Sequence, residues 1–376
     1  MSLQQNGKMK PESSVPRLWI LASPHSGDNT QLLALADGLA WPYEVKRLVY
    51  AKTEEAWRIL GLPTLMGVNL GASSPITAPW PDLVICAGRG AEAVAFWIRK
   101  NGNPKLRIVF IGTPWADPAK FDLVITTPQY GLPEAANILH NDLPIHGVTQ
   151  KKVAAEAERW RARLGHLPEP RIALLVGGSS GPYLFTAERA ARLGLEAGAK
   201  AKSIGASLLV TTSARTSIET ADALAAAIKV PFYFHRWDRV QADNPFLGFL
   251  GLSDRIIVTA DSISMLAEAS ATGKPVSLFD IEQGRQAMRA EENQPIMQGV
   301  MLPIHWWGRS FATTFFRLLM NVAPIRWSRD LRIVHRRLIA SGLASWLGEE
   351  TLPVARHEPQ HALKRSAARV RQLYGL

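Results

Sequence analysis

Short runs of apolar and β-branched residues alternate along the chain with segments whose apolar residues recur at helical spacing. In the first half, the runs with the length and composition of buried strands are residues 18–22, 45–49, 83–86, 108–111 and 123–126. Helical patterns lie between them, as at residues 29–40 and 91–100. Strands that alternate with helices are typical of a parallel α/β sheet.

The same alternation starts again after residues 164–170, where Gly165, Pro168 and Pro170 indicate a linker. The second series predicts strands at residues 172–176, 207–211, 232–234, 255–259 and 276–279, and helices at residues 187–204, 218–228 and 262–272. Each half opens with a strand, a loop of small residues and a helix. We therefore expect an α/β fold with two Rossmann-like domains facing each other across a cleft.

Composition and the linker together predict the domain limits and the cellular location of the protein. We expect a disordered tail at 1–16, an N-terminal Rossmann-like acceptor domain at 17–165, a C-terminal Rossmann-like donor domain at 166–300 and a C-terminal helical extension at 301–376. The single cysteine, Cys86, excludes a disulfide framework and a cysteine-based zinc site. Without a leader-like segment or an apolar run of ~20 residues, the chain is expected to be soluble and cytoplasmic.

Charge is concentrated in the predicted extension. The chain has a net charge of +11, and from residue 301 onward twelve Lys or Arg residues stand against four acids. The same segment contains Trp306, Trp307, Trp327 and Trp346. This composition favours an anionic partner such as a membrane surface or a phosphorylated acceptor, with nucleic acid the weaker alternative. Ordinary helices that pack on both domains would explain it equally well.

The most informative segment runs from residue 255 to residue 276. An apolar strand ends at Thr259, Asp261 or Ser262 can cap the helix that follows, and Gly273 suits the left-handed position at the end of that helix. A helix that begins after a parallel strand presents free N–H groups and the positive end of its dipole. The segment therefore predicts an anion site.

Spacing along this helix adds a second feature. Asp261, Ser264, Met265 and Glu268 follow at i, i+3, i+4 and i+7, which places them on one helix face. Glu268 would lie about 6 Å further along the axis than Ser264. The helix could thus hold phosphates at its end while Glu268 accepts hydrogen bonds from sugar hydroxyls. The alternative is an ordinary capped helix with a solvent-facing glutamate.

Two further segments of the second half could contact the same ligand. Gly177, Gly178 and Ser179 could cradle a phosphate, or they could form a tight strand-to-helix turn. Arg215 could pair with a phosphate or with a surface carboxylate. The glycine pattern is not Gly-x-Gly-x-x-Gly, and no acidic residue ends the next strand, which disfavours a nicotinamide dinucleotide.

The first half supplies candidates for the acceptor side. His25 and Asp28 are the titratable residues of the loop after the first strand, and a transferase that inverts the anomeric centre needs a base near the acceptor hydroxyl. Asp28 could instead cap the helix that begins near Asn29. Gly27, Asn29 and Arg89 are the acceptor-binding candidates, with a structural salt bridge as the alternative for Arg89.

Several stretches together resemble one known family. They are Thr259-Ala-Asp-Ser-Ile-Ser-Met-Leu-Ala-Glu-Ala, Thr272-Gly-Lys-Pro-Val276, Gly27-Asp-Asn-Thr-Gln31, Ala87-Gly-Arg89, Phe121-Asp-Leu123, Thr211-Thr-Ser-Ala-Arg-Thr216 and Asn244-Pro-Phe-Leu-Gly248. Across residues 18–280 the chain resembles the bacterial and plant Elm family, which is named for a plant mitochondrial-fission factor and includes bacterial glycosyltransferases. The match around Asp261 is the most specific part.

The resemblance implies a GT-B fold like that of cell-envelope transferases, for example the enzyme that adds N-acetylglucosamine to lipid-linked muramyl pentapeptide. There a helix N-terminus holds the donor diphosphate and a glutamate on that helix holds the ribose. By this likeness Ser262, Ser264 and Glu268 would bind a nucleoside-diphosphate sugar, most naturally of the UDP type, without a bound metal. The chain departs from the family pattern at Gln129-Tyr130, which replace a His-Asp pair, and at Ser23 and Phe246.

Two functions of different classes follow. The first is transfer of a sugar to a cell-envelope acceptor, lipid-linked or of the lipopolysaccharide type, in the cytoplasm at the inner face of the cytoplasmic membrane. The second is a non-catalytic adaptor on the same fold, as in organelle fission. A nucleotide-sugar epimerase of the Tyr-x-x-x-Lys type is excluded, because no tyrosine of the chain has lysine four residues later.

Overall fold

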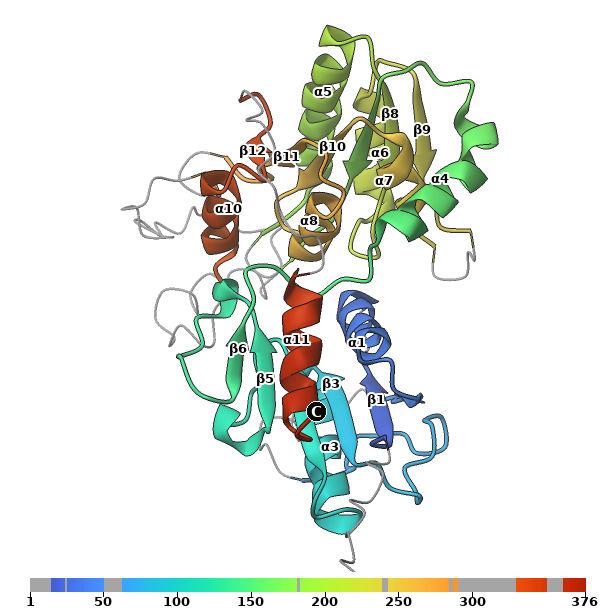
Figure 1. The fold of residues 1–376 in the computed structure, drawn as a ribbon. Helices are drawn as coiled ribbons and strands as arrows, with labels where there is room; N and C mark the ends of the chain where they lie inside the picture. The colour runs from blue at the N-terminus through green and yellow to red at the C-terminus, as the bar shows by residue number, and fades with distance from the viewer. Residues whose placement is uncertain are drawn as a thin grey trace, which may run out of the picture. The chain divides into compact units, whose positions relative to one another are not determined.

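A computed structural model describes residues 15–23, 26–50, 63–180, 183–238, 243–283, 287–289, 329–349 and 361–376. By its internal contacts the chain divides into two compact units, Met1–Leu123 and Val124–Leu376. Two six-stranded sheets make up the fold, and each carries helices on its faces (Figure 1). The domain limits predicted from the sequence stay a prediction.

The first sheet has the strand order β2-β1-β3-β4-β5-β6. Its strands are β1 (Leu18–Ala22), β2 (Tyr43–Arg47), β3 (Leu83–Ala87), β4 (Arg107–Ile111), β5 (Leu123–Thr126) and β6 (Ile138–His140). The helices of this part are α1 (Ser26–Leu39), α3 (Arg89–Asn101), η1 (Pro118–Lys120) and η2 (Pro128–Tyr130). The strand order reverses at β1, so the loops after β1 and β3 leave the sheet at a switch point.

The second sheet has the order β12-β11-β10-β7-β8-β9, and its pairs are parallel. Its strands are β7 (Arg171–Leu175), β8 (Ser207–Thr211), β9 (Phe232–His235), β10 (Arg255–Thr259), β11 (Val276–Phe279) and β12 (Ser345–Trp346). The helices are α4 (Gln150–Leu164), α5 (Ala187–Ser203), α6 (Ile218–Ala227), α7 (Phe246–Leu252), α8 (Ile263–Ser270), α10 (Leu331–Ala340) and α11 (His361–Gln372). The chain runs from β7 to β8 and β9 on one side and returns to β10 on the other.

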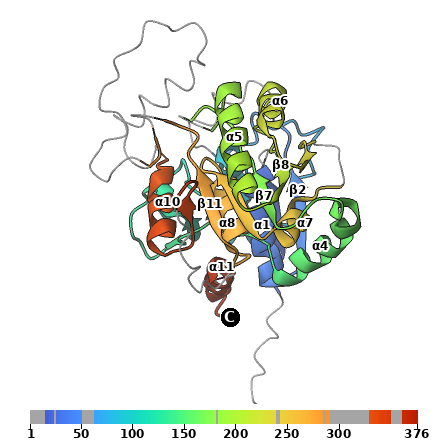
Figure 2. The same cartoon turned by 90° about the horizontal axis from the view of Figure 1, so that it is seen from above.

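Two helix pairs cover this second sheet. Helices α5 and α6 lie side by side, and so do α4 and α7 (Figure 2). A Cβ at Gly248 would stand 2.6 Å from the ring of Trp160, so α7 approaches α4 more closely than any other residue type allows. The glycine of the Asn-Pro-Phe-Leu-Gly stretch is therefore accounted for by packing of α7 on α4, with Trp160 buried in the core.

The predicted fold class is confirmed, because ten predicted strands recur in two parallel six-stranded sheets. The predicted strand limits are within a residue or two of those observed; β2 begins at Tyr43 instead of residue 45. Helix α1 begins three residues earlier than predicted. Strands β6 and β12 and helices α4 and α7 were not predicted. The predicted helical extension supplies α10 and α11, but it also adds β12 to the edge of the second sheet.

Among the residues that the structure describes, no helix combines the length and apolar character needed to cross a bilayer.

Candidate functional site

The predicted donor residues converge within the second unit, at the carboxyl ends of the adjacent strands β7 and β10. The order of the sheet reverses between these strands, which is where open parallel sheets bind ligands. Three loops meet there: the loop after β7, which contains Gly177 and Gly178, the loop after β8, which contains Arg215, and the turn from β10 into α8.

Asp261 forms the centre of this arrangement. The residue is 1% exposed, and its carboxylate accepts a hydrogen bond from the Gly178 amide at 2.9 Å through Oδ2 and pairs with Arg215 Nη2 at 2.8 Å. The other carboxylate oxygen, Oδ1, is buried and has no hydrogen-bond partner among the described residues. The prediction that Asp261 lies on the helix face with Ser264 and Glu268 is wrong, because its carboxylate turns inward to the glycine loop.

The glycine loop is shaped by this carboxylate. A Cβ at Gly177 would lie 2.3 Å from Asp261 Oδ2, and a Cβ at Gly178 would lie 2.2 Å from the Arg215 carbonyl oxygen. The Gly177 amide donates to Thr259 Oγ1 at 2.7 Å, so both glycine amides have acceptors inside the protein. The loop is a tight turn held onto β10, and its first two amides already have acceptors.

Arg215 joins two of the three loops. Besides pairing with Asp261, it donates from Nη1 to the Gly178 carbonyl oxygen at 3.0 Å. Ser213 Oγ donates to the Gly177 carbonyl oxygen at 2.8 Å from the same loop after β8. Ser179 is exposed, and its hydroxyl accepts a hydrogen bond from the Phe185 amide at 3.0 Å. Sequence spacing left an ion pair open for Arg215, and its partner is a buried carboxylate, not a surface one.

Helix α8 begins without the side-chain cap that its sequence predicts. Ser262 occupies the N-cap position with φ −108° and ψ 82°, and its hydroxyl makes no capping hydrogen bond. Its own amide donates to the Thr259 carbonyl oxygen at 3.1 Å. The first-turn amides of a helix have no intrahelical acceptor, so this end retains donors for an anion. Gly273 has a φ of +71°, as predicted.

The solvent side of α8 carries three of the predicted residues. Ser264, Met265 and Glu268 are half-buried, whereas Ile263, Leu266, Ala267, Ala269 and Ser270 are buried against the sheet. The Glu268 carboxylate has neither a hydrogen bond nor an ion pair within the described chain. Burial raises the pKa of Glu268 to about 7, because desolvation disfavours the charged form. Within the described part of the chain, an acid without a partner thus lies in the second turn of a helix whose N-terminus has no side-chain cap.

In the first unit, two residues from the start of α1 are hydrogen-bonded to Ser23, the residue after β1. Asp28 Oδ2 accepts a hydrogen bond from Ser23 Oγ at 2.8 Å, and Asn29 Oδ1 accepts one from the Ser23 amide at 2.8 Å. Helix α1 begins at Ser26, so Asp28 lies in its first turn. The interpretation of Asp28 as the N-cap of a helix starting near Asn29 is therefore wrong. Gly27 is half-buried in the same turn.

The remaining acceptor candidates are only partly described. His25 lies outside the described residues. Arg89 is the first residue of α3, but its side chain also lies outside them. The preceding Gly88 has a φ of +81°, which suits glycine. At Gly90, a Cβ would lie 2.7 Å from the Tyr50 ring, so α3 begins in close contact with that ring.

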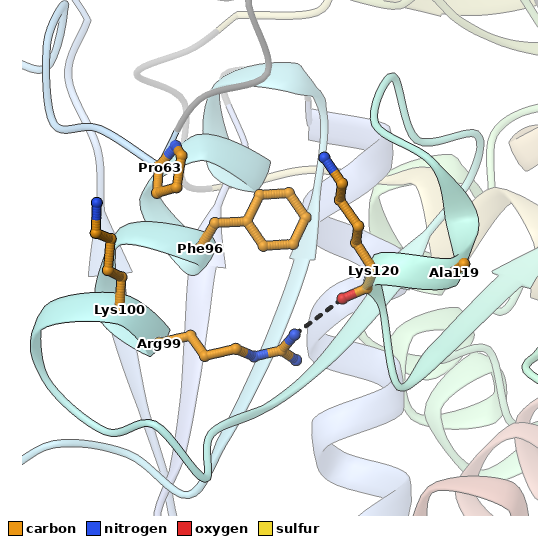
Figure 3. Close-up of a pocket in the computed structure, with 6 residues that line it drawn as sticks. All are labelled: Pro63, Phe96, Arg99, Lys100, Ala119 and Lys120. Atoms are coloured by element: carbon orange, nitrogen blue, oxygen red, sulfur yellow. Dashed lines mark hydrogen bonds between the residues drawn. The ribbon is translucent and has the colours of Figure 1, made fainter.

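A pocket elsewhere in the first unit contains none of these residues. It is lined by Pro63, Phe96, Arg99, Lys100, Ala119 and Lys120, at the C-terminal end of α3 (Figure 3). Arg99 is already neutralised, because it pairs with Asp122 and donates to the Lys120 carbonyl oxygen at 2.9 Å. Lysines at a helix C-terminus are the ordinary complement of its dipole. We assign this pocket no chemistry.

Sequence reasoning missed one residue at the second-unit site. His335 of α10 is buried, and its Nε2 lies 2.8 Å from the carbonyl oxygen of Ala260, the residue before Asp261. No local pattern marks this histidine, because its partner lies in a distant segment and its own helix resembles many amphipathic helices.

The sequence of the chain matches a known protein family. A model of the family described as Mitochondrial fission ELM1 matches residues 26–310, which is more than half of the chain. The chain belongs to the Mitochondrial fission ELM1 family. The matched range of this ELM1-family protein includes the β7, β8 and β10 loops and ends before α10, so His335 lies beyond it.

Two relatives illustrate the distance between members. The Mitochondrial fission protein ELM1 of Arabidopsis thaliana is 25% identical over 276 residues, which cover 62% of this chain and 63% of the plant protein's length. An uncharacterized protein of Rickettsia prowazekii, RP120, is 23% identical over 301 residues, which cover 70% of this chain and 82% of that protein.

Solved structures show a more distant likeness. A UDP-GlcNAc 2-epimerase from Neisseria meningitidis bound to UDP-GlcNAc has a TM-score of 0.47 at 12% identity, covering 96% of this chain and 100% of that chain. A glycosyltransferase from Rickettsia africae has a TM-score of 0.41 at 11% identity, covering 87% and 98%. At this level of similarity, neither structure indicates a ligand or a reaction for the ELM1-family protein.

Proposed function

We propose that this ELM1-family protein is a glycosyltransferase of the GT-B type that takes its sugar from a nucleoside-diphosphate sugar, with a UDP sugar as the first candidate. The observation that carries the proposal is that the α8 N-terminus has no side-chain cap and that Glu268, on the half-buried face of the same helix, has no partner among the described residues. Both lie at the switch point of a parallel sheet, the usual place for a nucleotide.

The diphosphate would bind at the start of α8. First-turn amides and the helix dipole favour an anion there, and the hydroxyls of Ser262 and Ser264 add donors. A buried carboxylate at this position would repel the ligand. The ion pair with Arg215 offsets the charge of Asp261, so the local field of the helix end stays positive. Gly177, Gly178 and Thr259 would shape the floor, and Ser179 and Met265 would line its margin.

Glu268 would accept hydrogen bonds from the hydroxyls of the ribose or the donor sugar. A carboxylate that receives hydrogen bonds is favoured in its ionised form, so ligand binding should pull its pKa down from about 7. The expected distance of about 6 Å along the axis from Ser264 suits a ligand whose phosphates occupy the helix end.

The acceptor side is proposed from the first unit and the basic end of the chain. Asp28 is the base we propose, with His25 as the second candidate, and Gly27, Asn29 and Arg89 would contact the acceptor. Lys364 and Arg365 of α11 are exposed, while Ser366 and Val370 of the same helix are buried. This exposed cationic face supports an anionic glycolipid or polysaccharide acceptor at the inner face of the cytoplasmic membrane.

The non-catalytic alternative has one observation in its favour, namely the fission role in the name of the family and of the plant relative. A protein that retained the fold as an adaptor would not need an open helix end or an unpartnered acid. Nucleotide binding therefore separates the two functions.

The test is calorimetric titration of the whole protein with UDP and with other nucleoside diphosphates. We expect Glu268→Ala and Ser262→Ala to weaken binding about five- to thirtyfold each, as removal of a hydrogen bond to a polar ligand does. The matched control is Glu196→Ala, which removes a glutamate from α5 whose partner is Arg192. Absence of binding by the unaltered protein at millimolar concentration would favour the adaptor.

A further inference from the structure

One contact joins the segment after residue 329 to the start of α8. His335 lies on α10, is fully buried, and places Nε2 2.8 Å from the Ala260 carbonyl oxygen. A carbonyl oxygen can only accept, so Nε2 carries the proton and donates. Ala260 is the residue between the last position of β10 and Asp261, where the backbone leaves the sheet.

The imidazole is held in one orientation by its surroundings. It packs edge-on against the Trp346 ring, with ring centroids 5.6 Å apart and planes at 75°. Trp346 belongs to β12, which pairs with β11. Burial lowers the pKa of His335 to about 4, so the ring is neutral near pH 7. His335 therefore donates through a single fixed tautomer.

Helix α10 is itself anchored at its start. Asp330 accepts a hydrogen bond from the Arg332 amide through its side chain, at 3.0 Å, and its own amide donates to the Gln129 carbonyl oxygen at 2.9 Å. These bonds limit movement of α10 along its axis. Both views show α10 beside β11, the neighbour of β10 (Figures 1 and 2).

Other groups of the turn around Ala260 are held by partners within the sheet or its loops. The Ala260 amide donates to the Phe279 carbonyl oxygen at 2.9 Å, and the Asp261 carboxylate is held by Gly178 and Arg215. The Ala260 carbonyl receives its donor from α10. Removal of that donor would free the peptide that sets the direction in which the chain enters α8.

We propose that His335 is a positioning residue of the donor site: by fixing the Ala260 peptide it orients the first-turn amides of α8 toward the diphosphate. Its consequence for ligand binding rests on the proposed function, whereas its effect on the turn does not. The C-terminal segment thereby becomes part of the nucleotide-binding half, although it contributes no group that touches the ligand.

Two substitutions separate the effect of the hydrogen-bond donor from the effect of the side chain's volume. The glutamine amide nitrogen can take the place of Nε2, so His335→Gln keeps the hydrogen bond, whereas asparagine reproduces the position of Nδ1, so His335→Asn loses it. Val334→Ala is the matched control, because Val334 is equally buried on α10 and its side chain has no polar group. It loosens the helix without removing the donor.

The first measurement is hydrogen–deuterium exchange of residues 260–266 in the unliganded protein. We expect His335→Asn to speed exchange there about five- to tenfold, corresponding to loss of one hydrogen bond, and His335→Gln to stay within about twofold of the unaltered protein. Val334→Ala should lower the melting temperature and leave this peptide unchanged. Equal exchange in the Asn and Gln variants, or an equal effect of Val334→Ala, would overturn the proposal.

The second measurement is the dissociation constant for UDP in the same variants. Weakening of about five- to tenfold in His335→Asn, with recovery in His335→Gln, is expected. Unchanged affinity in His335→Asn despite faster exchange would refute the role in binding. If the unaltered protein binds no nucleotide, the proposed function fails, and the exchange data still decide whether His335 holds the turn.

Discussion

Arg215 and Asp261 form an ion pair in which the carboxylate is fully buried and the guanidinium is more than a third exposed, with 2.8 Å between Nη2 and Oδ2. The pair spans β7, because Arg215 follows β8 and Asp261 follows β10 on the opposite side. It therefore closes the loops on both sides of the switch point over the glycine turn. The positive charge of Arg215 offsets the negative charge of Asp261, so the buried carboxylate opposes an anion at the start of α8 less strongly.

Replacement of Arg215 by leucine should destabilise the protein, because it leaves Asp261 buried without a counter-charge. Allowing for the partial exposure of Arg215, we expect a loss of about 1–3 kcal/mol in the free energy of unfolding. Asp261→Asn in the same chain should recover part of the loss, which denaturant titration of the two single variants and the double variant measures. Arg236→Leu breaks a surface pair with Asp222 and should cost less than about 1 kcal/mol. Equal costs for Arg215→Leu and Arg236→Leu would contradict the buried-charge account.

Gly177→Ala should be among the most damaging single-methyl additions to this chain. Its Cβ would stand 2.3 Å from Asp261 Oδ2, so either the turn or the ion pair must move. We expect a drop in melting temperature and loss of nucleotide binding. Gly198→Ala on α5 is the matched control, since its nearest neighbour atom is 3.8 Å away and alanine favours a helix by about 1 kcal/mol. An unchanged melting temperature in Gly177→Ala would contradict the close approach of Asp261 to this position.

The Glu268 carboxyl should make stability fall with rising pH. Its pKa is raised from 4.5 to about 7 in the folded state, so between these values the folded protein binds more protons than the unfolded chain. Stability from this group is full below about pH 4.5 and is lost as pH rises through 7. Compared with Glu268→Gln, the unaltered protein should lose relative stability from pH 5 to pH 8 in thermal unfolding. Parallel curves for the two proteins would argue against a desolvated carboxyl.

His335 should act in the opposite direction on the acid side. Its pKa is lowered from 6.5 to about 4 by burial, with Asp330 favouring and Arg329 opposing the charged ring. The unfolded chain binds the proton first as pH falls, so stability from this group is full above pH 6.5 and is lost toward pH 4. His335→Gln does not titrate, and its melting temperature should fall less between pH 7 and pH 5. If the melting temperature of His335→Gln fell as steeply as that of the unaltered protein, groups other than His335 would cause the loss of stability in acid.

The sheets could be predicted because each central strand is a short and mostly apolar run that local composition reveals. β10 and β11, for example, were located to the residue. β12 could not be found, since a two-residue strand carries no periodicity and exists only because α10 brings it to the edge of β11. Pairing between distant segments, not composition, defines such an element.

In the candidate site too, features within one segment could be predicted, whereas contacts between distant segments could not. The face shared by Ser264, Met265 and Glu268 follows from helical spacing within one segment, and the structure has it. The role of Asp261 does not follow, because its partner Arg215 belongs to another loop, and helix spacing alone assigned it to the exposed face. The same limit applies to His335, whose acceptor, Ala260, is 75 residues away in the sequence.

The position of β12 bears on how the second sheet could be studied in a shorter chain. A chain shortened near residue 310, where the family match ends, would lose β12 and α10 together. β11 would then become an open edge, and exposed strand edges template association between molecules. Fragments that stop there should self-associate, whereas fragments that continue through residue 349 keep their outer strand and the donor to Ala260.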